Sequence, residues 1–408
     1  MVETRRRRRP ISREEALARQ EKKRRQKERE ALNRELAKGP IDLPFCLLVL
    51  MLMGIGLVML LSASFPSAYY DNNDPIKYFR QQGVFAIAGV AAMLFIGKIN
   101  YQRFRGAAKP LLYLSIVLLV LVIIPGNPIA LTRNNATRWL GIRNTSFQFQ
   151  PSEVAKMAVV LYFSDTISKK KDKMNTTRYG VAPYLLILGV LSVLMMLEPH
   201  LSGTVLILGA GAVLMLVGGI NLTWVAAAVA GAGGIAFLMF SGVIKYGQSR
   251  LAMWQNPWLD PRGDGYQLVQ SLLSIGSGGL WGVGLGKSLQ KFLYLPEEHN
   301  DFIFAIVCEE LGLVGATIIM LLFAALILRG YWIALHARDR FGSLLVVGVT
   351  TLIAMQTFLN IGVVTGLLPT TGISLPFFSY GGTALMIQLA EMGIVLSVSR
   401  QMKPTKAG

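Results

Sequence analysis

The feature that most constrains this chain is a series of apolar segments, each suited to crossing a membrane, that recurs from residue 43 almost to the C-terminus. A membrane-spanning helix needs about 20 mostly apolar residues and satisfies its backbone hydrogen bonds internally. The hydrophobic fraction of 53% and the charged fraction of 16% fit a membrane protein better than a soluble one. Ten spans are expected, near residues 43–61, 83–96, 111–124, 154–167, 181–197, 204–219, 223–243, 302–328, 343–367 and 385–398. The sequence therefore predicts an all-α polytopic membrane protein with about ten transmembrane helices.

The formal net charge of +18 is unevenly distributed along the chain. Arg and Lys gather in the first forty residues and in short segments between the apolar runs, as is typical of cytoplasmic loops. This placement argues against nucleic acid as a partner and puts both termini in the cytoplasm. We expect a basic charged extension over residues 1–40, a transmembrane bundle over 41–400 and a cytoplasmic tail over 401–408. The extension could rest on anionic lipid or dock a cytoplasmic partner.

Between the seventh and eighth spans lies a long external segment, residues 244–300, which is rich in glycine and aromatic residues. Long loops at membrane faces tend to carry function, although its Trp and Tyr residues could simply be interface anchors. A second polar interruption, from Leu368 to Thr383, is interpreted as the wall of a cavity rather than a plain helix kink. The two cysteines, Cys46 and Cys308, and the three histidines show no metal-ligand spacing.

An acidic stretch, Tyr294 to Gly312, joins the long external segment to the eighth span. Acids at a membrane edge are costly and indicate a functional site. Asp301 could lie at the mouth of a cavity, or simply favour a helix N-terminus through the macrodipole. Glu309 and Glu310 cannot share one helical face, so we expect at most one of them to point into a cavity with Asp301. These deeper glutamates need buried partners.

Two further polar groups lie near predicted span ends. Glu153 and Lys156 are three residues apart, which predicts an intrahelical pair facing the bundle. Glu198-Pro199-His200 could be a polar site in a broken helix, although a lone histidine is more often a satisfied hydrogen-bond partner. The sequence shows no serine nucleophile elbow and no cysteine–histidine pairing that would indicate a hydrolase.

Several motifs resemble those of the SEDS membrane proteins of bacterial growth, division and sporulation (FtsW, RodA, SpoVE). They occur in order through nearly all of the chain after residue 40, and the Asn-Pro-Trp wording resembles the FtsW/SpoVE branch. The matching blocks are Arg138-Trp139, Gln150-Pro-Ser-Glu-Val-Ala-Lys156, Asn256-Pro-Trp258, Gly265-Tyr-Gln267, Tyr294-Leu-Pro-Glu297, Asp301-Phe-Ile-Phe304, Glu309-Glu-Leu-Gly312 and Pro369 to Thr383. One departure is His200, where many members have aspartate.

The resemblance implies a ten-span bundle that polymerises lipid II into glycan strands at the outer face of the cytoplasmic membrane. It implies a class B penicillin-binding protein as partner, together with other divisome proteins at the septum and membrane lipids. The family's essential aspartate falls on Asp301, which we expect to act as general base. The alternatives are a lipid II flippase, a non-catalytic divisome scaffold and a sporulation-specific paralogue.

The reaction implied by the resemblance releases a polyprenyl pyrophosphate, whose charge needs cations or a metal. Arg250, Lys287 and Lys291 are candidates by charge and location, and Mg²⁺ or Mn²⁺ could contribute, although no protein metal ligands are predicted. Lipid II contacts are expected from these three residues and from Arg138, Trp139, Glu153, Lys156, Gln270, Glu297, His299, Ser379 and Thr383.

Overall fold

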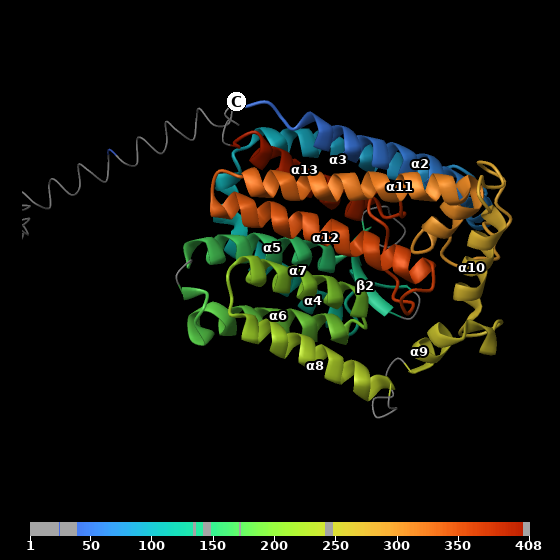
Figure 1. Cartoon of the computed structure of the whole chain (residues 1–408). Helices are drawn as coiled ribbons and strands as arrows, with labels where there is room; N and C mark the ends of the chain where they lie inside the picture. The colour runs from blue at the N-terminus through green and yellow to red at the C-terminus, as the bar shows by residue number, and fades with distance from the viewer. Residues whose placement is uncertain are drawn as a thin grey trace, which may run out of the picture.

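The computed structural model describes residue 24 and residues 39–133, 136–141, 148–170, 173–240 and 248–402. Ten helices occupy the ten predicted positions in this part of the chain, running alongside one another (Figure 1). They are α2 (Leu43–Asn72), α3 (Lys77–Lys98), α4 (Phe104–Ile123), α5 (Pro151–Lys169), α6 (Ala182–Leu197), α7 (Leu201–Val217), α8 (Leu222–Phe240), α11 (Ile303–His336), α12 (Arg340–Val364) and α13 (Gly382–Ser399). Seven helical segments are long and apolar enough to cross a membrane, which confirms the predicted all-α polytopic fold. The predicted basic extension and C-terminal tail lie mostly outside the described residues.

Helix α5 has four charged residues and therefore does not qualify as a span by composition, yet most of it is buried. Its charges are paired instead of facing lipid. Glu153 and Lys156 form an ion pair of 2.8 Å with each other, as predicted from their spacing. Near its other end, Asp165 binds Lys169 at 2.6 Å and Arg105 at 3.0 Å. Buried charges are tolerated when they are paired, so α5 can occupy the interior of the bundle.

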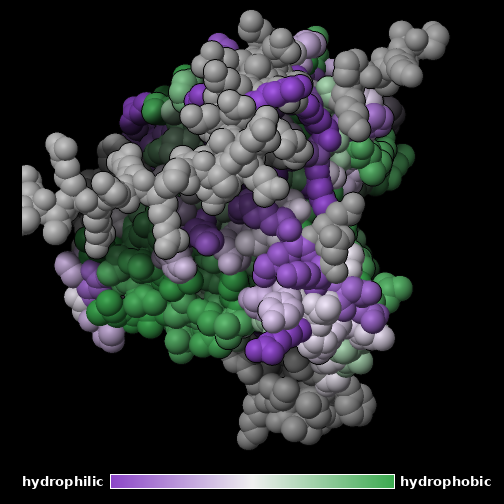
Figure 2. Space-filling view, turned by 90° about the vertical axis from the view of Figure 1, so that its left-hand side faces the viewer, coloured by the Kyte–Doolittle hydropathy of each residue, from purple (hydrophilic) through white to green (hydrophobic). Residues whose placement is uncertain are grey.

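One end of the bundle holds both ends of the described chain, and we call it the termini end. There the guanidinium of Arg400 donates to the Gly39 carbonyl at 2.7 Å, and Arg329 pairs with Asp42 at 2.7 Å. Arg105 also binds Asp339 at the start of α12. Viewed from this side, hydrophilic residues cross the face and hydrophobic ones cover its flank (Figure 2).

The opposite end, called the sheet end, contains structure that the sequence analysis missed. Segment 125–150, between the third and fourth predicted spans, was given no predicted structure, and it holds a three-stranded antiparallel sheet with strand order β1-β2-β3. The strands are β1 (Ala130–Arg133), β2 (Ala136–Gly141) and β3 (Gln148–Phe149). The long segment 244–300 contains the helices α9 (Gln248–Gln255) and α10 (Tyr266–Gly278) and the short turn η4 (Pro257–Leu259). Both regions lie at the same end of the bundle in Figure 1.

Helices α2 and α11 run well past their predicted ends. At 30 and 34 residues they are about 45 and 51 Å long at 1.5 Å per residue, whereas the hydrocarbon core is about 30 Å thick. The polar residues after position 61 therefore continue α2 instead of starting a loop. Within α11, Gly312 has φ +66° and ψ −171°, which breaks the helix one turn after Glu309. A left-handed φ of this kind favours glycine. There is also no space for a side chain, because a Cβ at this position would lie 2.3 Å from the Gly282 nitrogen.

Candidate functional site

Asp301 lies at the sheet end, two residues before α11 begins. It is half-buried, and no residue in the described part of the chain hydrogen-bonds to its carboxylate. Its backbone carbonyl accepts a hydrogen bond of 2.7 Å from the Asn360 amide. Gly372 lies close by, and an added Cβ there would be 3.1 Å from the Asp301 carboxylate. The carboxylate is therefore positioned by its backbone while its oxygens stay available.

The electrostatic surroundings of Asp301 favour its protonated form more than water does. Burial raises the pKa of Asp301 to about 6, and the neighbouring Glu297 carboxylate adds to this rise. Arg138 and His299 act in the opposite direction and lower this pKa. A carboxyl with a pKa near 6 is deprotonated at neutral pH but remains basic enough to accept a proton.

The segment between α12 and α13 lies against Asp301, and its interpretation as a cavity wall stays a prediction. Asn360 of α12 also donates to the Ile373 carbonyl at 2.7 Å, so one amide ties this segment to Asp301. The Ser379 hydroxyl donates to the Asn300 carbonyl at 2.7 Å and accepts from the Leu375 amide at 2.7 Å. Thr383, at the start of α13, binds a carbonyl of β3 at 2.8 Å.

His299 lies on an aromatic platform beside Asp301. Its ring stacks on Tyr78 of α3 with centroids 4.8 Å apart, and Tyr380 meets both rings edge-on. The imidazole contacts the buried Glu298 carboxylate at 3.2 Å, and the His299 carbonyl accepts from the Tyr380 amide at 2.9 Å. Tyr78, Tyr380 and Asn360 were not predicted as site residues from the sequence. A polar Asn360 inside an apolar run was the available signal for one of them.

Arg138 of β2 connects the sheet to the break between α6 and α7. Its guanidinium donates to the carbonyls of Glu198 and Pro199, and its charge influences Asp301. Trp139 follows it on β2 and is half-buried. Glu297 has φ +58° and accepts from the Asn300 amide at 2.5 Å. Arg138, Glu297 and His299 are thus brought together around Asp301.

Lys291 occupies a different place from the one its charge suggested. Its ammonium is buried, binds the Glu310 carboxylate at 3.0 Å and also donates to Ser62 of α2 at 3.0 Å. Glu309 accepts from Ser288 at 2.5 Å and from the Leu289 amide at 3.0 Å. Neither glutamate contacts Asp301, because both hold the segment that crosses the break in α11. We call Lys291, Glu309, Glu310, Ser62 and Ser288 the buried latch.

The backbone completes this latch at Gly312. The amides of Val283 and Gly284 donate to the carbonyls of Glu309 and Glu310, at 2.9 and 3.1 Å. The amide of Leu313 donates to the Gly279 carbonyl at 2.9 Å. Segment 244–300 therefore replaces helix hydrogen bonds lost at the break, and this fixes the path of the chain that leads to Asp301.

The remaining predicted site residues are more dispersed. Lys287 is exposed, Gln270 is half-buried on α10, and exposed Arg250 of α9 reaches the Thr370 carbonyl at 3.5 Å. The Glu153–Lys156 pair lies deeper in the bundle, where its charges influence Glu391 of α13.

The described residues contain no group of three or more His, Cys, Asp or Glu side chains arranged to hold a metal ion. Glu297, Glu298 and His299 are consecutive in sequence with Asp301 close by, but they are used in other contacts.

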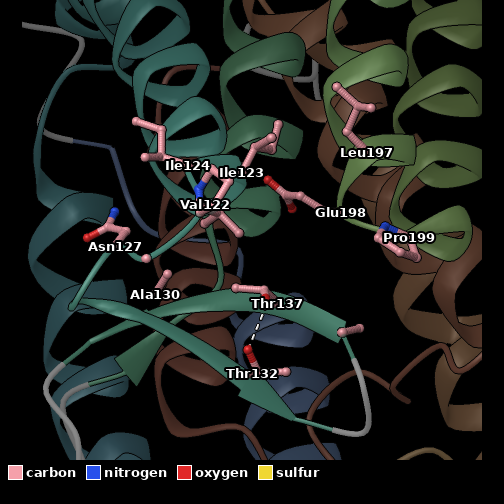
Figure 3. Close-up of a pocket in the computed structure, with 13 residues that line it drawn as sticks. Val122, Ile123, Ile124, Asn127, Ala130, Thr132, Thr137, Leu197, Glu198 and Pro199 are labelled. Carbon is pink, nitrogen blue, oxygen red and sulfur yellow. Dashed lines mark hydrogen bonds between the residues drawn. The ribbon is translucent and has the colours of Figure 1, made fainter.

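A separate pocket of about 460 Å³ lies where β1 and β2 meet the ends of α4 and α6 (Figure 3). We call it the Glu198 pocket. The Glu198 side chain projects into it toward Val122 and Ile123 of α4. His200, just after it, is buried next to Gln150, with ring and amide nitrogens 3.3 Å apart, which confirms a hydrogen-bond partner for this histidine.

The chain is similar to known proteins along most of its length. Residues 43–404 match the family of cell cycle proteins FtsW, RodA and SpoVE. The chain is 42% identical over 360 residues to the stage V sporulation protein E of Bacillus subtilis, covering 88% of this chain and 97% of that protein. It is 42% identical over 366 residues to the probable peptidoglycan glycosyltransferase FtsW of Geobacter metallireducens, covering 89% and 96%.

Solved structures show the same likeness. One, described as structural coordination of polymerization and crosslinking by a peptidoglycan synthase complex, superposes with a TM-score of 0.73 at 26% identity. That match covers 88% of this chain and 98% of the other. The rod shape determining protein RodA of Thermus thermophilus matches with a TM-score of 0.65 at 26% identity, over 90% and 99% of the two chains. The chain belongs to the FtsW, RodA and SpoVE family of membrane proteins, the SEDS family that its motifs indicated.

Proposed function

We propose that this chain is a peptidoglycan glycosyltransferase of the FtsW type, which polymerises lipid II at the sheet end of the bundle. The names of its relatives support the enzyme class. The observation that carries the proposal is the Asp301 carboxylate, half-buried and without a hydrogen-bond donor among the described side chains. Such a group is suited to receive a proton from a substrate.

In the proposed step, a sugar hydroxyl of the acceptor attacks the anomeric carbon of the donor. A bond forms between the hydroxyl oxygen and that carbon, and the bond from the carbon to the pyrophosphate oxygen breaks. Asp301 takes the hydroxyl proton, and the polyprenyl pyrophosphate leaves with its electron pair. Proton transfer to a positioned base contributes about 10²–10⁴-fold to a rate.

The leaving pyrophosphate needs positive charge near it. Arg138, whose charge reaches Asp301, is the cation best placed by the described geometry, and exposed Arg250 and Lys287 could approach a bound lipid. Lys291 is less suitable because Glu310 neutralises it within the buried latch. We also propose that Mg²⁺ or Mn²⁺ accompanies the pyrophosphate. Polymerisation in the presence of EDTA would test this.

A second candidate function is lipid II translocation, because a flippase also needs polar residues within the bundle, such as the Glu153–Lys156 pair. The two functions are separated by assaying the purified full chain with lipid II in detergent, where there are no two membrane faces. We expect glycan polymer to accumulate, with or without a cognate transpeptidase but more strongly with it. Lipid II that stays monomeric under both conditions would contradict the glycosyltransferase and favour the flippase.

The proposed partner is a class B penicillin-binding protein, since a relative of similar fold is part of a peptidoglycan synthase complex. We further propose that the sheet end faces the outside of the cytoplasmic membrane at the division septum, among other divisome proteins. Both termini then lie in the cytoplasm, which agrees with Gly39 and Arg400 meeting at the opposite end. A sporulation role is the alternative, since both FtsW and SpoVE names occur among the relatives.

A further inference from the structure

Glu198 has no role in the proposed reaction, yet it is placed as a ligand-binding group. Its side chain is 2% exposed, and neither carboxylate oxygen has a hydrogen-bond partner among the described residues. Buried polar groups without partners cost free energy and are rare in native proteins. Figure 3 shows the carboxylate directed into the Glu198 pocket, away from its own backbone. A guest in that pocket would supply the missing partner.

The electrostatics of the pocket favour a cation. Burial raises the pKa of Glu198 to about 8, with the charge of Arg138 opposing the rise, so a proton or another positive charge has to compensate the carboxylate. No Lys, Arg or His is among the residues that line the pocket in the described part of the chain. The lining includes the C-terminal ends of α4 and α6, where the helix macrodipole attracts positive charge.

The rim of the pocket is apolar and open. Ile124 is 47% exposed and Leu197 is 61% exposed, at the ends of α4 and α6. Along the same two helices, Val117 and Val193 are also exposed hydrophobic side chains, as expected for surfaces that contact lipid. A guest that reaches the pocket from the membrane can therefore keep an alkyl chain on apolar surface while its headgroup meets Glu198.

We propose that the Glu198 pocket binds the primary ammonium headgroup of a membrane amphiphile, with the alkyl chain lying along α4 and α6. This site goes beyond the proposed glycosyltransferase function and does not depend on it. A primary ammonium has three N–H donors, which match the two free oxygens of Glu198 and a helix-end carbonyl. A pocket of about 460 Å³ is large enough for such a headgroup. A trimethylated headgroup has the charge but no N–H donor.

The test is native mass spectrometry of the purified full chain, loaded with equimolar lipids that share the same acyl chains. The lipids are phosphatidylethanolamine, phosphatidylcholine and N-acylated phosphatidylethanolamine, which differ in the N–H donors and charge of the headgroup. We expect phosphatidylethanolamine to be retained about tenfold more than the other two lipids, because only its headgroup can form a charge-assisted hydrogen bond with Glu198. Equal retention of all three would overturn the proposal.

Variants locate the site. Glu198→Gln keeps the shape of the side chain and should remove the preference, and Ala136→Leu should also remove it by filling the pocket while keeping the carboxylate. Asp74→Asn, which removes a carboxylate on the α2–α3 connection that forms an ion pair with exposed Arg80, is the matched control and should keep the preference. A preference that survives in Glu198→Gln would contradict the assignment. Soluble hexylammonium that displaces the lipid at equal concentration would contradict a membrane source.

Discussion

Asp301→Asn is expected to lower the rate of lipid II polymerisation by about 10²–10⁴-fold, the contribution of a positioned general base. The amide occupies nearly the same volume as the carboxylate but cannot accept the hydroxyl proton. The fold should be unaffected, because the contact that fixes residue 301 is made by its backbone carbonyl with Asn360. The measurement is the initial rate of glycan formation by purified protein in detergent.

The matched control is Asp264→Asn, which removes an exposed carboxylate from the nearby segment 244–300. This variant should polymerise at nearly the wild-type rate, and both variants should elute as wild type does in size-exclusion chromatography. Near-normal polymerisation by Asp301→Asn would rule out Asp301 as the base. It would not bear on the Glu198 pocket, which is assayed by lipid retention.

Glu310→Ala is expected to destabilise the protein by about 3–5 kcal/mol, because it leaves the buried Lys291 ammonium without its counter-charge. The same change removes the acceptor for the Ser62 hydroxyl, so α2 loses one of its two side-chain contacts with the latch and keeps the one that Lys291 donates to Ser62. Asp74→Asn breaks the exposed Asp74–Arg80 pair and should cost only about 0–1 kcal/mol. Denaturant titration of the detergent-solubilised protein measures both free energies of unfolding.

A double variant separates charge from packing in the latch. Glu310→Leu with Lys291→Met replaces the ion pair by apolar side chains of similar volume, and should recover much of the stability lost in Glu310→Ala. Polymerisation should fall in Glu310→Ala because the latch fixes the path of the chain that leads to Asp301. Wild-type stability of Glu310→Ala would show that the ion pair does not hold this segment.

The arrangement of long helices could be predicted from the sequence because lipid imposes a simple rule. Each span has to be apolar and helical, so the apolar segments that begin at residues 43, 302 and 343 predict α2, α11 and α12. The sheet was missed because β1 and β2 have only four and six residues and form through pairing with each other. The ends of α2 and α11 were also missed, since hydropathy marks where lipid ends but helices continue beyond it.

The site was predictable only in part. The motif resemblance singled out Asp301, and the Glu153–Lys156 spacing predicted the observed ion pair. The pairing of Lys291 with Glu310 was not predictable, because it depends on the break at Gly312, where backbone from segment 244–300 hydrogen-bonds to α11. A lysine close to an expected pyrophosphate site therefore suggested a ligand contact, whereas the fold uses it to hold the loop.

That Asp301 acts as the base is tested most directly by the pH dependence of lipid II polymerisation. The carboxylate form is the active one, and the pKa of Asp301 is raised to about 6. The rate should therefore be constant near neutral pH and fall about tenfold per unit below pH 6. In Arg138→Ala the fall should begin at higher pH, because the charge that lowers this pKa is gone. A wild-type rate that stays constant between pH 5 and pH 7 would contradict the proposed role of Asp301.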